Sequence, residues 1–402
     1  MSHVAIVGAG PAGASLAFLL ASRGVQVSLI ERRRDFEREF RGEILLPSGV
    51  KALRSMGIQQ VLDETPTYVP QDFALYLNTR KVFQLDIETA WFEGAPPIAI
   101  SQPAFLESII GLANETGCLD FLRGISVKSL FHDGERVAGL VYEDESGEHK
   151  LDADLVIGCD GRYSMIRRFL KIQATTISTP MDIVWCKIPC PAEFKGVRAY
   201  LGRGHLLIAY KTWDGNLQLG WVILKGRFKA LKDQGVGHWL QEMQRHISTD
   251  LADHLSTNIS NLEKPFLLVS DSDRVDQWSR SGGLVIGDAA HTMSPVGGQG
   301  INIALRDSIV TANHLVPLLL GNISHLKLDA ALCAIEKERL PELIPVQQFQ
   351  ALPPKVVLNN AWWAEPIRRF AGHALARESV RAKAAVRLRS MLFGITEVNL
   401  EI

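Results

Sequence analysis

Residues that could bind a sugar or a phosphate gather in the last third of this 402-residue sequence. The apolar stretch 283–286 ends in Gly287-Asp288, and a glycine-containing loop then opens another apolar stretch. A carboxylate at a strand end can accept hydrogen bonds from sugar hydroxyls, and the first turn of a helix offers backbone N–H groups to an anion. The pattern predicts contacts with a large cofactor, made by Gly287, Asp288, Pro295, Gly298, Gln299, Gly300, Ile301 and Asn302.

A second group of such residues lies at the N-terminus. Residues 4–7 are apolar, and the loop that follows them contains Gly8, Gly10, Pro11, Ala12 and Gly13. The first glycine permits a tight turn, the second lets the backbone approach a pyrophosphate, and the third lets the next helix pack on the strand. A further apolar stretch ends at Glu31-Arg32, where the carboxylate can accept both hydroxyls of an adenosine ribose. These features predict a strand–helix–strand dinucleotide site.

A third motif lies between these two. The apolar run 155–157 predicts a strand buried on both faces, and it leads into Asp160-Gly161, followed by Arg167. Open α/β sheets bind ligands at the carboxyl ends of their strands, so this turn is expected at the ligand-binding edge. Two separate cofactor contacts on a chain with one dinucleotide fingerprint favour a cofactor that lies extended across the fold. FAD meets that description better than a nicotinamide dinucleotide.

The order of the predicted elements indicates an α/β protein. We expect a Rossmann-like domain that binds FAD and NAD(P)H, interleaved with a β-sheet substrate domain of α+β type, and followed by C-terminal helices. The first domain is predicted to comprise residues 1–72, 97–180 and 270–340, the second residues 73–96 and 181–269, and the helical C-terminal segment residues 341–402.

Hydrophobic periodicity and turn residues give the expected elements. Helices are predicted at 47–56, 103–115, within 228–263 and from the glycine loop to 320. Strands are predicted at 73–77, 82–85, 119–129, 136–143, 183–188, 206–210 and 217–224. The tail from 331 is predicted to be helical with interruptions at Pro341, Pro345 and Pro353-Pro354, because proline lacks the N–H that a helix interior needs.

Composition narrows the class of protein. The net charge of −1 gives no reason to expect a nucleic-acid partner or an anionic membrane surface. The five cysteines are scattered, so neither a metal site nor a disulfide framework is predicted. The first strand begins at His3, which leaves no room for a signal peptide, and no apolar run approaches the ~20 residues of a spanning helix. We therefore expect a cytoplasmic protein without stable membrane insertion, as a monomer or a homodimer.

The three motifs, in this order, resemble those of the single-component flavoprotein aromatic hydroxylases, the group typified by para-hydroxybenzoate hydroxylase. The resemblance covers roughly residues 1–320 and includes that family's nucleotide fingerprint, its Asp-Gly motif and its Gly-Asp motif. Two smaller matches agree with it: Arg41 lies in the loop where the family places an arginine over the cofactor, and Gln102 fits a polar residue near the flavin.

This resemblance implies an FAD-dependent monooxygenase. NADH or NADPH would dock transiently and reduce FAD, O₂ would then give a flavin hydroperoxide, and an aromatic or similarly electron-rich substrate would be hydroxylated. It also implies that Asp288 binds ribose or ribityl hydroxyls and that Pro295 forms a wall beside the flavin ring. The loop 297–300 would stabilise the anionic reduced flavin at its pyrimidine edge. Asp160 would serve cofactor binding and reduction.

The residues that meet the substrate are less clearly marked. The region 198–224 matches by position the sheet that lines the family's substrate pocket, and its candidates are Tyr200, Tyr210, Lys211 and Trp221, together with Pro295. Side chains alternate along a strand, so Tyr210 and Lys211 cannot both point inward. The arginine that binds the carboxylate of a benzoate has no clear counterpart. His291 is expected to be structural.

Other activities occur on the same fold. A flavin-dependent halogenase is disfavoured because the sequence has no Trp-x-Trp-x-Ile-Pro run and Lys81 lacks the expected setting. A reductase of polyprenyl chains is a further alternative. A non-catalytic binding protein is disfavoured because all three cofactor motifs are intact.

Overall fold

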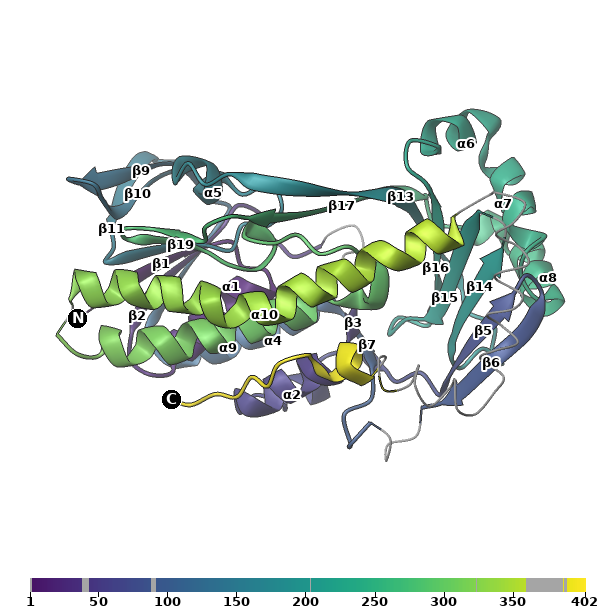
Figure 1. The fold of residues 1–402 in the computed structure, drawn as a ribbon, viewed down its shortest axis with the longest axis horizontal. Helices are drawn as coiled ribbons and strands as arrows, with labels where there is room; N and C mark the ends of the chain where they lie inside the picture. The colour runs from purple at the N-terminus through teal and green to yellow at the C-terminus, as the bar shows by residue number, and fades with distance from the viewer. Residues whose placement is uncertain are drawn as a thin grey trace.

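The computed structural model describes residues 2–37, 43–87, 92–202, 204–322, 324–358, 386 and 389–402. Two sheets lie at opposite ends of an elongated molecule, and the long strands β13 (Ala174–Pro189) and β17 (Phe266–Val275) run from one end to the other (Figure 1). The first end carries the dinucleotide fingerprint, and the second carries the candidate substrate residues.

The first sheet has six strands in the order β18-β19-β12-β1-β2-β8. They are β1 (His3–Val7), β2 (Gln26–Glu31), β8 (Leu119–Arg123), β12 (Leu155–Gly158), β18 (Ser279–Arg280) and β19 (Gly283–Val285). All neighbouring pairs are parallel except β18–β19. β12 and β19 are buried along their whole length, as expected of central strands covered on both faces.

Helices and two small sheets surround this sheet. The helices are α1 (Pro11–Ala21), α2 (Pro47–Ser55), α3 (Val61–Glu64), α4 (Gln102–Glu115), α5 (Met165–Phe169) and α9 (Gly300–Leu319). One small sheet contains β9 (Ser126–Asp133), β10 (Arg136–Asp144) and β11 (Gly147–Asp152), and the other contains β3 (Ile44–Leu45), β4 (Thr67–Tyr68) and β7 (Ile98–Ile100). α1 packs against both α4 and α9, so the fingerprint helix lies between them.

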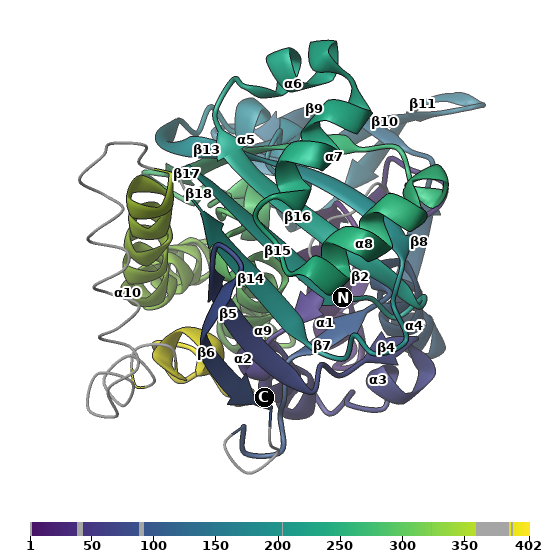
Figure 2. The same ribbon diagram turned by 90° about the vertical axis from the view of Figure 1, so that its right-hand side faces the viewer.

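The second sheet has seven strands in the order β17-β13-β16-β15-β14-β5-β6. Besides the two long strands it contains β5 (Asp72–Leu77), β6 (Arg80–Asp86), β14 (Val197–Gly202), β15 (His205–Lys211) and β16 (Asn216–Leu224). Its outer face is covered by α6 (Phe228–Gln234), α7 (Val236–Gln244) and α8 (Thr249–Thr257), followed by the short turn η1 (Ile259–Asn261) (Figure 2). The inner face is turned toward the first domain (Figure 1).

The two faces of the second sheet have separate apolar cores. The outer core joins strand residues such as Tyr200 and Trp221 to Trp239 of α7. The inner core joins Trp185 and Tyr210 to Val296, which lies in the glycine loop after β19. Strand alternation therefore divides the sheet residues between a helix-covered face and a face that meets the predicted cofactor loop.

The predicted breaks in the C-terminal helix are wrong. α10 (His325–Val357) is one helix that passes through Pro341, Pro345, Pro353 and Pro354 and begins before residue 331. Each proline removes one helical hydrogen bond. Leu343 and Val346 are buried, so tertiary packing holds the helix together across the two middle prolines.

The last residues run without helical structure from 394 to 402 and lie along α9. Arg306 donates to the Thr396 carbonyl at 2.6 Å, and Asn313 donates to the Asn399 carbonyl at 2.8 Å. Leu400 N donates to Ser55 of α2 at 2.7 Å. This part of the segment predicted to be helical is therefore an extended strap. Residues 359–385 of the same predicted segment lie outside the described residues.

Candidate functional site: a cofactor cradle and an adjoining sheet face

The three motifs leave neighbouring strands at the same edge of the first sheet. The glycine fingerprint follows β1, the Asp160 turn follows β12, and the Gly287-Asp288 turn follows β19. β1 pairs in parallel with β12, and β12 pairs in parallel with β19, so the three carboxyl ends lie side by side. This is the edge at which open α/β sheets bind ligands.

The three fingerprint glycines have different surroundings. A Cβ on Gly8 would lie 2.5 Å from the Cys159 carbonyl oxygen, and one on Gly13 would lie 1.9 Å from the Gly8 carbonyl oxygen. A Cβ on Gly10 would have no atom within 4 Å. Gly8 and Gly13 are therefore required for close packing within the protein, whereas Gly10 faces open space where a phosphate could approach.

The start of α1 is free to bind an anion. Its N-cap residue Gly10 provides no side-chain cap, and Pro11 at the first turn lacks an N–H. Ala12 packs behind this turn, 3.1 Å from where a Cβ on Gly287 would lie. The unpaired N–H groups and the helix dipole suit a pyrophosphate.

Glu31 lies at the end of β2 and is buried. Its Oε2 accepts a hydrogen bond from Ala9 N at 3.0 Å, and its Oε1 accepts one from Arg33 N at 3.0 Å. These bonds from two backbone N–H groups fix the carboxylate at the end of β2, where the fingerprint places the acid that meets a ribose. Arg32 is exposed beside it.

Asp160 caps the short helix α5. Its Oδ2 accepts from Met165 N at 2.6 Å and from Ile166 N at 3.1 Å, and its Oδ1 accepts from the Ser164 hydroxyl. Burial raises the pKa of Asp160, and these hydrogen bonds oppose the rise. The carboxylate therefore shapes the turn after β12, which is a role that the sequence motif did not reveal.

Arg167 ties the second motif to the third. Its guanidinium donates to the carbonyl of Arg162 at 2.9 Å and to that of Ala289 at 3.1 Å, and it lies 3.4 Å from Asp273 of β17. Arg167 thus positions the turn that carries Asp288, which is itself half-buried.

A buried ion network holds the third motif against α9. Asp307 accepts from Gly287 N at 3.1 Å, from His291 Nε2 at 2.7 Å and from Arg339 Nε at 2.7 Å. Although burial opposes it, the charges of His291 and Arg339 hold the pKa of Asp307 below its ordinary value. Arg339 also contacts Glu342 at 2.7 Å. His291 lies within this network, in agreement with the structural role expected for it.

The glycine loop before α9 faces open space. Gly297 and Gly298 have positive φ angles of 77° and 64°, and a Cβ on either residue, or on Gly300, would have no atom within 4 Å. α9 begins without a side-chain cap. Pro295 precedes this loop and is half-buried. The backbone here can approach a flat ring closely.

The side chains around this loop form hydrogen bonds and apolar contacts within the protein. Gln299 donates to the Met391 carbonyl at 2.6 Å. Asn302 accepts from Leu46 N at 2.8 Å and donates to the Gly298 carbonyl at 2.8 Å. Ile301 is buried in the first core. Any contact that Gln299 and Asn302 make with a cofactor would therefore come from their backbone, while their side chains hold the loop in place.

Two further residues were predicted to contact the cofactor. Gln102 is the first residue of α4 and is half-buried. Arg41 lies outside the described residues.

The four candidate substrate residues that lie on the second sheet fall on different faces. Tyr200 stacks on Tyr76 with centroids 4.6 Å apart, and Trp221 stacks on Trp239 at 5.7 Å; both belong to the outer core. Only Tyr210 is on the inner face. Lys211 is the next residue of β15, so its side chain points to the opposite face.

Lys211 lies over the ring of Tyr68, 5.0 Å from its centroid. The alternation of side chains along a strand showed that Tyr210 and Lys211 point to opposite faces. It could not show which face is turned toward the glycine loop.

Other inner-face residues carry no motif that marks them in the sequence. Trp185 lies edge-on to Tyr210 with centroids 6.4 Å apart, and a Cβ on Gly220 would lie 2.5 Å from its ring. Glu43, Lys187 and Gln218 are polar residues on or beside this face. The signal that could have found them is the pairing of β13, β16 and β15, which a single sequence does not give.

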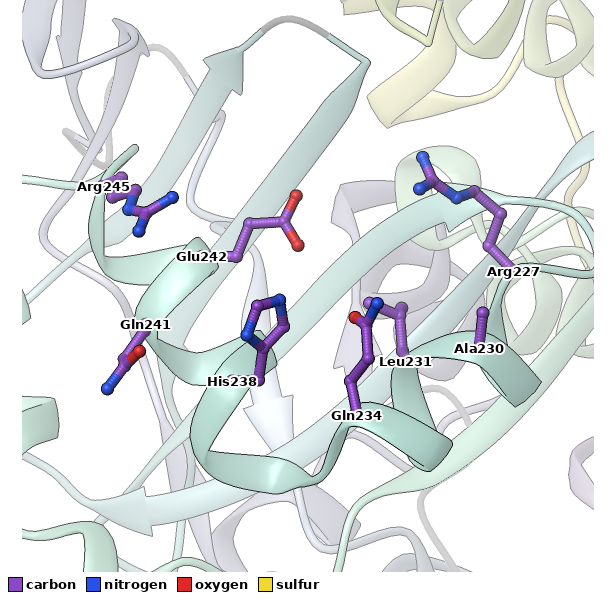
Figure 3. A pocket seen from close by; sticks show the side chains of 8 residues that line it. All are labelled: Arg227, Ala230, Leu231, Gln234, His238, Gln241, Glu242 and Arg245. Carbon is purple, nitrogen blue, oxygen red and sulfur yellow. The ribbon is translucent and has the colours of Figure 1, made fainter.

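Two surface pockets lie away from the motifs. One, of about 260 Å³, is lined by α6 and α7 side chains such as Arg227, His238 and Glu242 (Figure 3). The other, of about 350 Å³, is lined by His3, Asp154 and neighbouring residues at the amino ends of β1 and β12. Neither contains a predicted site residue, so neither is assigned to the cofactor.

The residues present fit FAD. There is open space next to Gly10 and next to the 297–300 loop. Each position lies at the start of a helix without a side-chain cap, and these two helices, α1 and α9, pack against each other. The region therefore offers two separate positions for an anion. Glu31 suits the adenosine end, and the inner sheet face adjoins the other end through Val296. In the described part of the chain, no cluster of metal-ligating side chains occurs. Nor does any described helix combine the length and apolarity needed to cross a bilayer.

Comparison with known proteins agrees with this geometry. Residues 1–341 match the family described as FAD binding domain. The chain is 30% identical to 6-methylpretetramide 4-monooxygenase of Streptomyces rimosus, over 98% of this chain and 95% of that protein. It is 27% identical to squalene monooxygenase SE2 of Panax ginseng, over 78% of this chain but 58% of that protein.

Solved structures share the fold. p-Nitrophenol 4-monooxygenase PnpA from Pseudomonas putida superposes with a TM-score of 0.81 at 15% identity, covering 99% of this chain and 100% of that one. PqsL of P. aeruginosa gives a TM-score of 0.77 at 19% identity, covering 91% and 100% of the two chains.

Fold and motifs together define an FAD-dependent oxidoreductase. The chain belongs to the single-component FAD-dependent monooxygenases, the aromatic hydroxylase family that its three motifs resemble. The predicted α/β fold, the FAD cofactor and the monooxygenase class are thereby confirmed.

Proposed function

We propose that the protein uses NADH or NADPH and O₂ to hydroxylate an aromatic substrate with several fused rings. The observation that carries this proposal is the inner sheet face, where Trp185, Tyr210 and aliphatic side chains adjoin Val296 of the glycine loop. A flat apolar face suits a flat apolar substrate. The relative from Streptomyces rimosus, whose name gives 6-methylpretetramide as its substrate, supports the same class.

The residues of the cradle would divide the work of binding. Backbone N–H groups at Gly10 and the start of α1 would hold the pyrophosphate, and Glu31 would hold the adenosine ribose. Asp288 would bind hydroxyls of the ribityl chain. The N-terminus of α9 would stabilise negative charge on the ring.

Bound FAD would supply the redox chemistry that activates O₂. The protein would hold the substrate on the inner sheet face, with Pro295 and Val296 between sheet and loop. Apolar side chains there would exclude water. Exclusion of water favours transfer of oxygen to the substrate over release of hydrogen peroxide. NAD(P)H would dock transiently, since the chain has a single dinucleotide fingerprint.

We also assign residues 1–72, 97–180 and 270–340 to cofactor binding and residues 73–96 and 181–269 to substrate binding, with 341–402 as a C-terminal segment. Two of these boundaries fall inside β13 and β17, which belong to the second sheet but reach the first domain. The two parts would therefore move little relative to each other.

Isotope tracing tests the reaction. Flavin-loaded protein is supplied with NADH or NADPH, ¹⁸O₂ and a panel of hydroxylated polycyclic aromatics, with bromide present in a parallel series. We expect one labelled oxygen atom in the product and oxidation of the nicotinamide. A halogenated product, or a product without label, would contradict monooxygenation.

A further inference from the structure

Three polar side chains form a row across the inner face of the second sheet. Tyr210 of β15 pairs directly with Gln218 of β16, and Gln218 pairs directly with Lys187 of β13. Side chains at directly paired positions lie on the same face, with Cβ atoms about 4.5–5.5 Å apart. The row crosses a face that also carries buried apolar side chains, such as Trp185 and Val222.

Glu43 lies beside this row. Its Oε1 is 3.9 Å from Lys187 Nζ, and its charge adds to burial in raising the pKa of Tyr210. Ile44, the next residue, packs in the inner core, and its carbonyl accepts from Asn302 at 3.3 Å. Because Asn302 also bonds Gly298, Glu43 is tied to the glycine loop before α9.

Three polar atoms of this group have no partner among the described residues: Tyr210 Oη, Gln218 Oε1 and Glu43 Oε2. Their residues are only 2%, 0% and 8% exposed. By contrast, Gln218 Nε2 donates to the Cys186 carbonyl at 3.0 Å, and Lys187 contacts Asp214 at 2.9 Å. Gln218 and Lys187 are thus held in place by these contacts, while the three atoms named above have no hydrogen-bond partner.

Buried polar atoms normally have partners, and leaving one without a partner is unfavourable. Three such atoms on one face, next to the predicted ring end of the cofactor, indicate a site completed by a ligand. The amide oxygen and, when Glu43 is ionised, the carboxylate oxygen accept hydrogen bonds, so the ligand must bring donors. The phenol of Tyr210 can donate to a carbonyl oxygen.

We propose that Glu43, Gln218 and Tyr210 bind the substrate through its hydroxyl groups and a nearby carbonyl oxygen, with its rings against Trp185. This deepens the proposed function and rests on it. The ligand class is a polycyclic aromatic that carries hydroxyls beside a carbonyl. Gln218 and Glu43 accept from the hydroxyls, and Tyr210 donates to the carbonyl.

Glu43 makes binding depend on pH. Burial raises the pKa of Glu43 to about 7, Lys187 opposes this, and Asp214 and Glu263 add to it. A hydroxyl donor binds the ionised carboxylate, so affinity should increase as the pH rises through 7 until the ligand itself ionises. In Glu43→Gln this increase should be lost.

The test uses Tyr210→Phe, which removes only the orphan hydroxyl, and Tyr200→Phe as the matched control. Tyr200 lies on the neighbouring strand but on the outer face, where its hydroxyl contacts Ser248 at 3.1 Å. The probes are a dihydroxyanthraquinone with both hydroxyls beside one carbonyl and unsubstituted anthraquinone. Binding to the flavin-loaded protein is followed through the flavin absorbance.

We expect Tyr210→Phe and Glu43→Gln each to weaken binding of the dihydroxy probe about tenfold. Tyr210→Phe removes one buried hydrogen bond, and Glu43→Gln replaces a charged acceptor by a neutral one. Neither Tyr200→Phe with the dihydroxy probe nor Glu43→Gln with plain anthraquinone should show this loss. Equal weakening by Tyr200→Phe would indicate a general effect on the sheet. Unchanged affinity in both inner-face variants would mean that the orphan atoms bind internal water, and either result would overturn the proposal.

This binding measurement is separate from turnover. If the wild type binds the dihydroxy probe as described but incorporates no oxygen from O₂ into any substrate, the proposed reaction fails and the binding site stands. If oxygen is incorporated while the two inner-face variants bind like the wild type, the reaction stands and this assignment fails.

Discussion

At the scale of single residues, the site depends on carboxylates in different surroundings. Asp160 is used for capping, Asp307 is locked in an ion network, and Asp288 is half-buried at a strand end. The sequence could identify Asp160 and Asp288, because each follows a strand and adjoins a glycine, but it gave no sign of Asp307, which lies inside α9. It could not assign their partners, since these come from distant segments such as Arg339 of α10.

Asp288→Ala should give protein largely without flavin, because the variant loses the carboxylate proposed to bind the ribityl hydroxyls. The bound flavin per protein chain after gel filtration measures this, and circular dichroism checks the fold. Asp276→Ala, an exposed acid at the end of β17, is the control and should keep its flavin. Full flavin content in Asp288→Ala would remove the role assigned to Asp288.

The titration of Glu43 should be visible in stability. Its pKa in the folded protein is about 7 against an ordinary value of 4.5, with burial as the main cause. The folded state therefore holds the proton more tightly, and wild-type stability should fall as the pH rises from 4.5 to 7.

Glu43→Gln has no such titration. Relative to the wild type, its free energy of unfolding should rise across this window by up to about 3 kcal/mol, from the shift of the pKa to about 7. Urea unfolding at a series of pH values measures the difference. A difference between the two proteins that stays constant with pH would show that Glu43 titrates normally.

At the scale of elements, the fingerprint, the helices after it and most strands could be predicted, because their periodicity and glycines are local signals. The continuous α10 could not, since its prolines signal a break and only burial of Leu343 and Val346 shows why it persists. The sequence also could not show that Tyr200 and Trp221 lie on the outer face of the second sheet. Period-two alternation separates two faces but does not say which one the helices α6–α8 cover.

α10 also holds the third motif through its buried arginine. Arg339→Met would leave Asp307 without its arginine partner and should lower the free energy of unfolding by about 3–5 kcal/mol. The exposed pair Arg34–Glu145 gives the control, because Arg34→Met should cost less than about 1 kcal/mol. Chemical denaturation measures the free energy of unfolding of both variants. A similarly small decrease in the two would show that the ion network contributes little to stability.

At the scale of the whole molecule, the cradle and the sheet face are built from segments far apart in sequence. β13 and β17 connect the two ends, and the 394–402 strap joins α2 to α9. The overall α/β class could be predicted because motif order reflects strand order in the first sheet. The inner face could not, because it depends on pairings among β13, β16 and β15.

We propose that one FAD molecule extends from Glu31 to the 297–300 loop, with its ring facing the inner face of the second sheet. A crystal structure of the flavin-loaded protein tests this directly. We expect the adenosine ribose at Glu31, the pyrophosphate at Gly10 and the isoalloxazine ring between Pro295 and Tyr210. A flavin ring bound elsewhere, for example between α6 and α7, would contradict it.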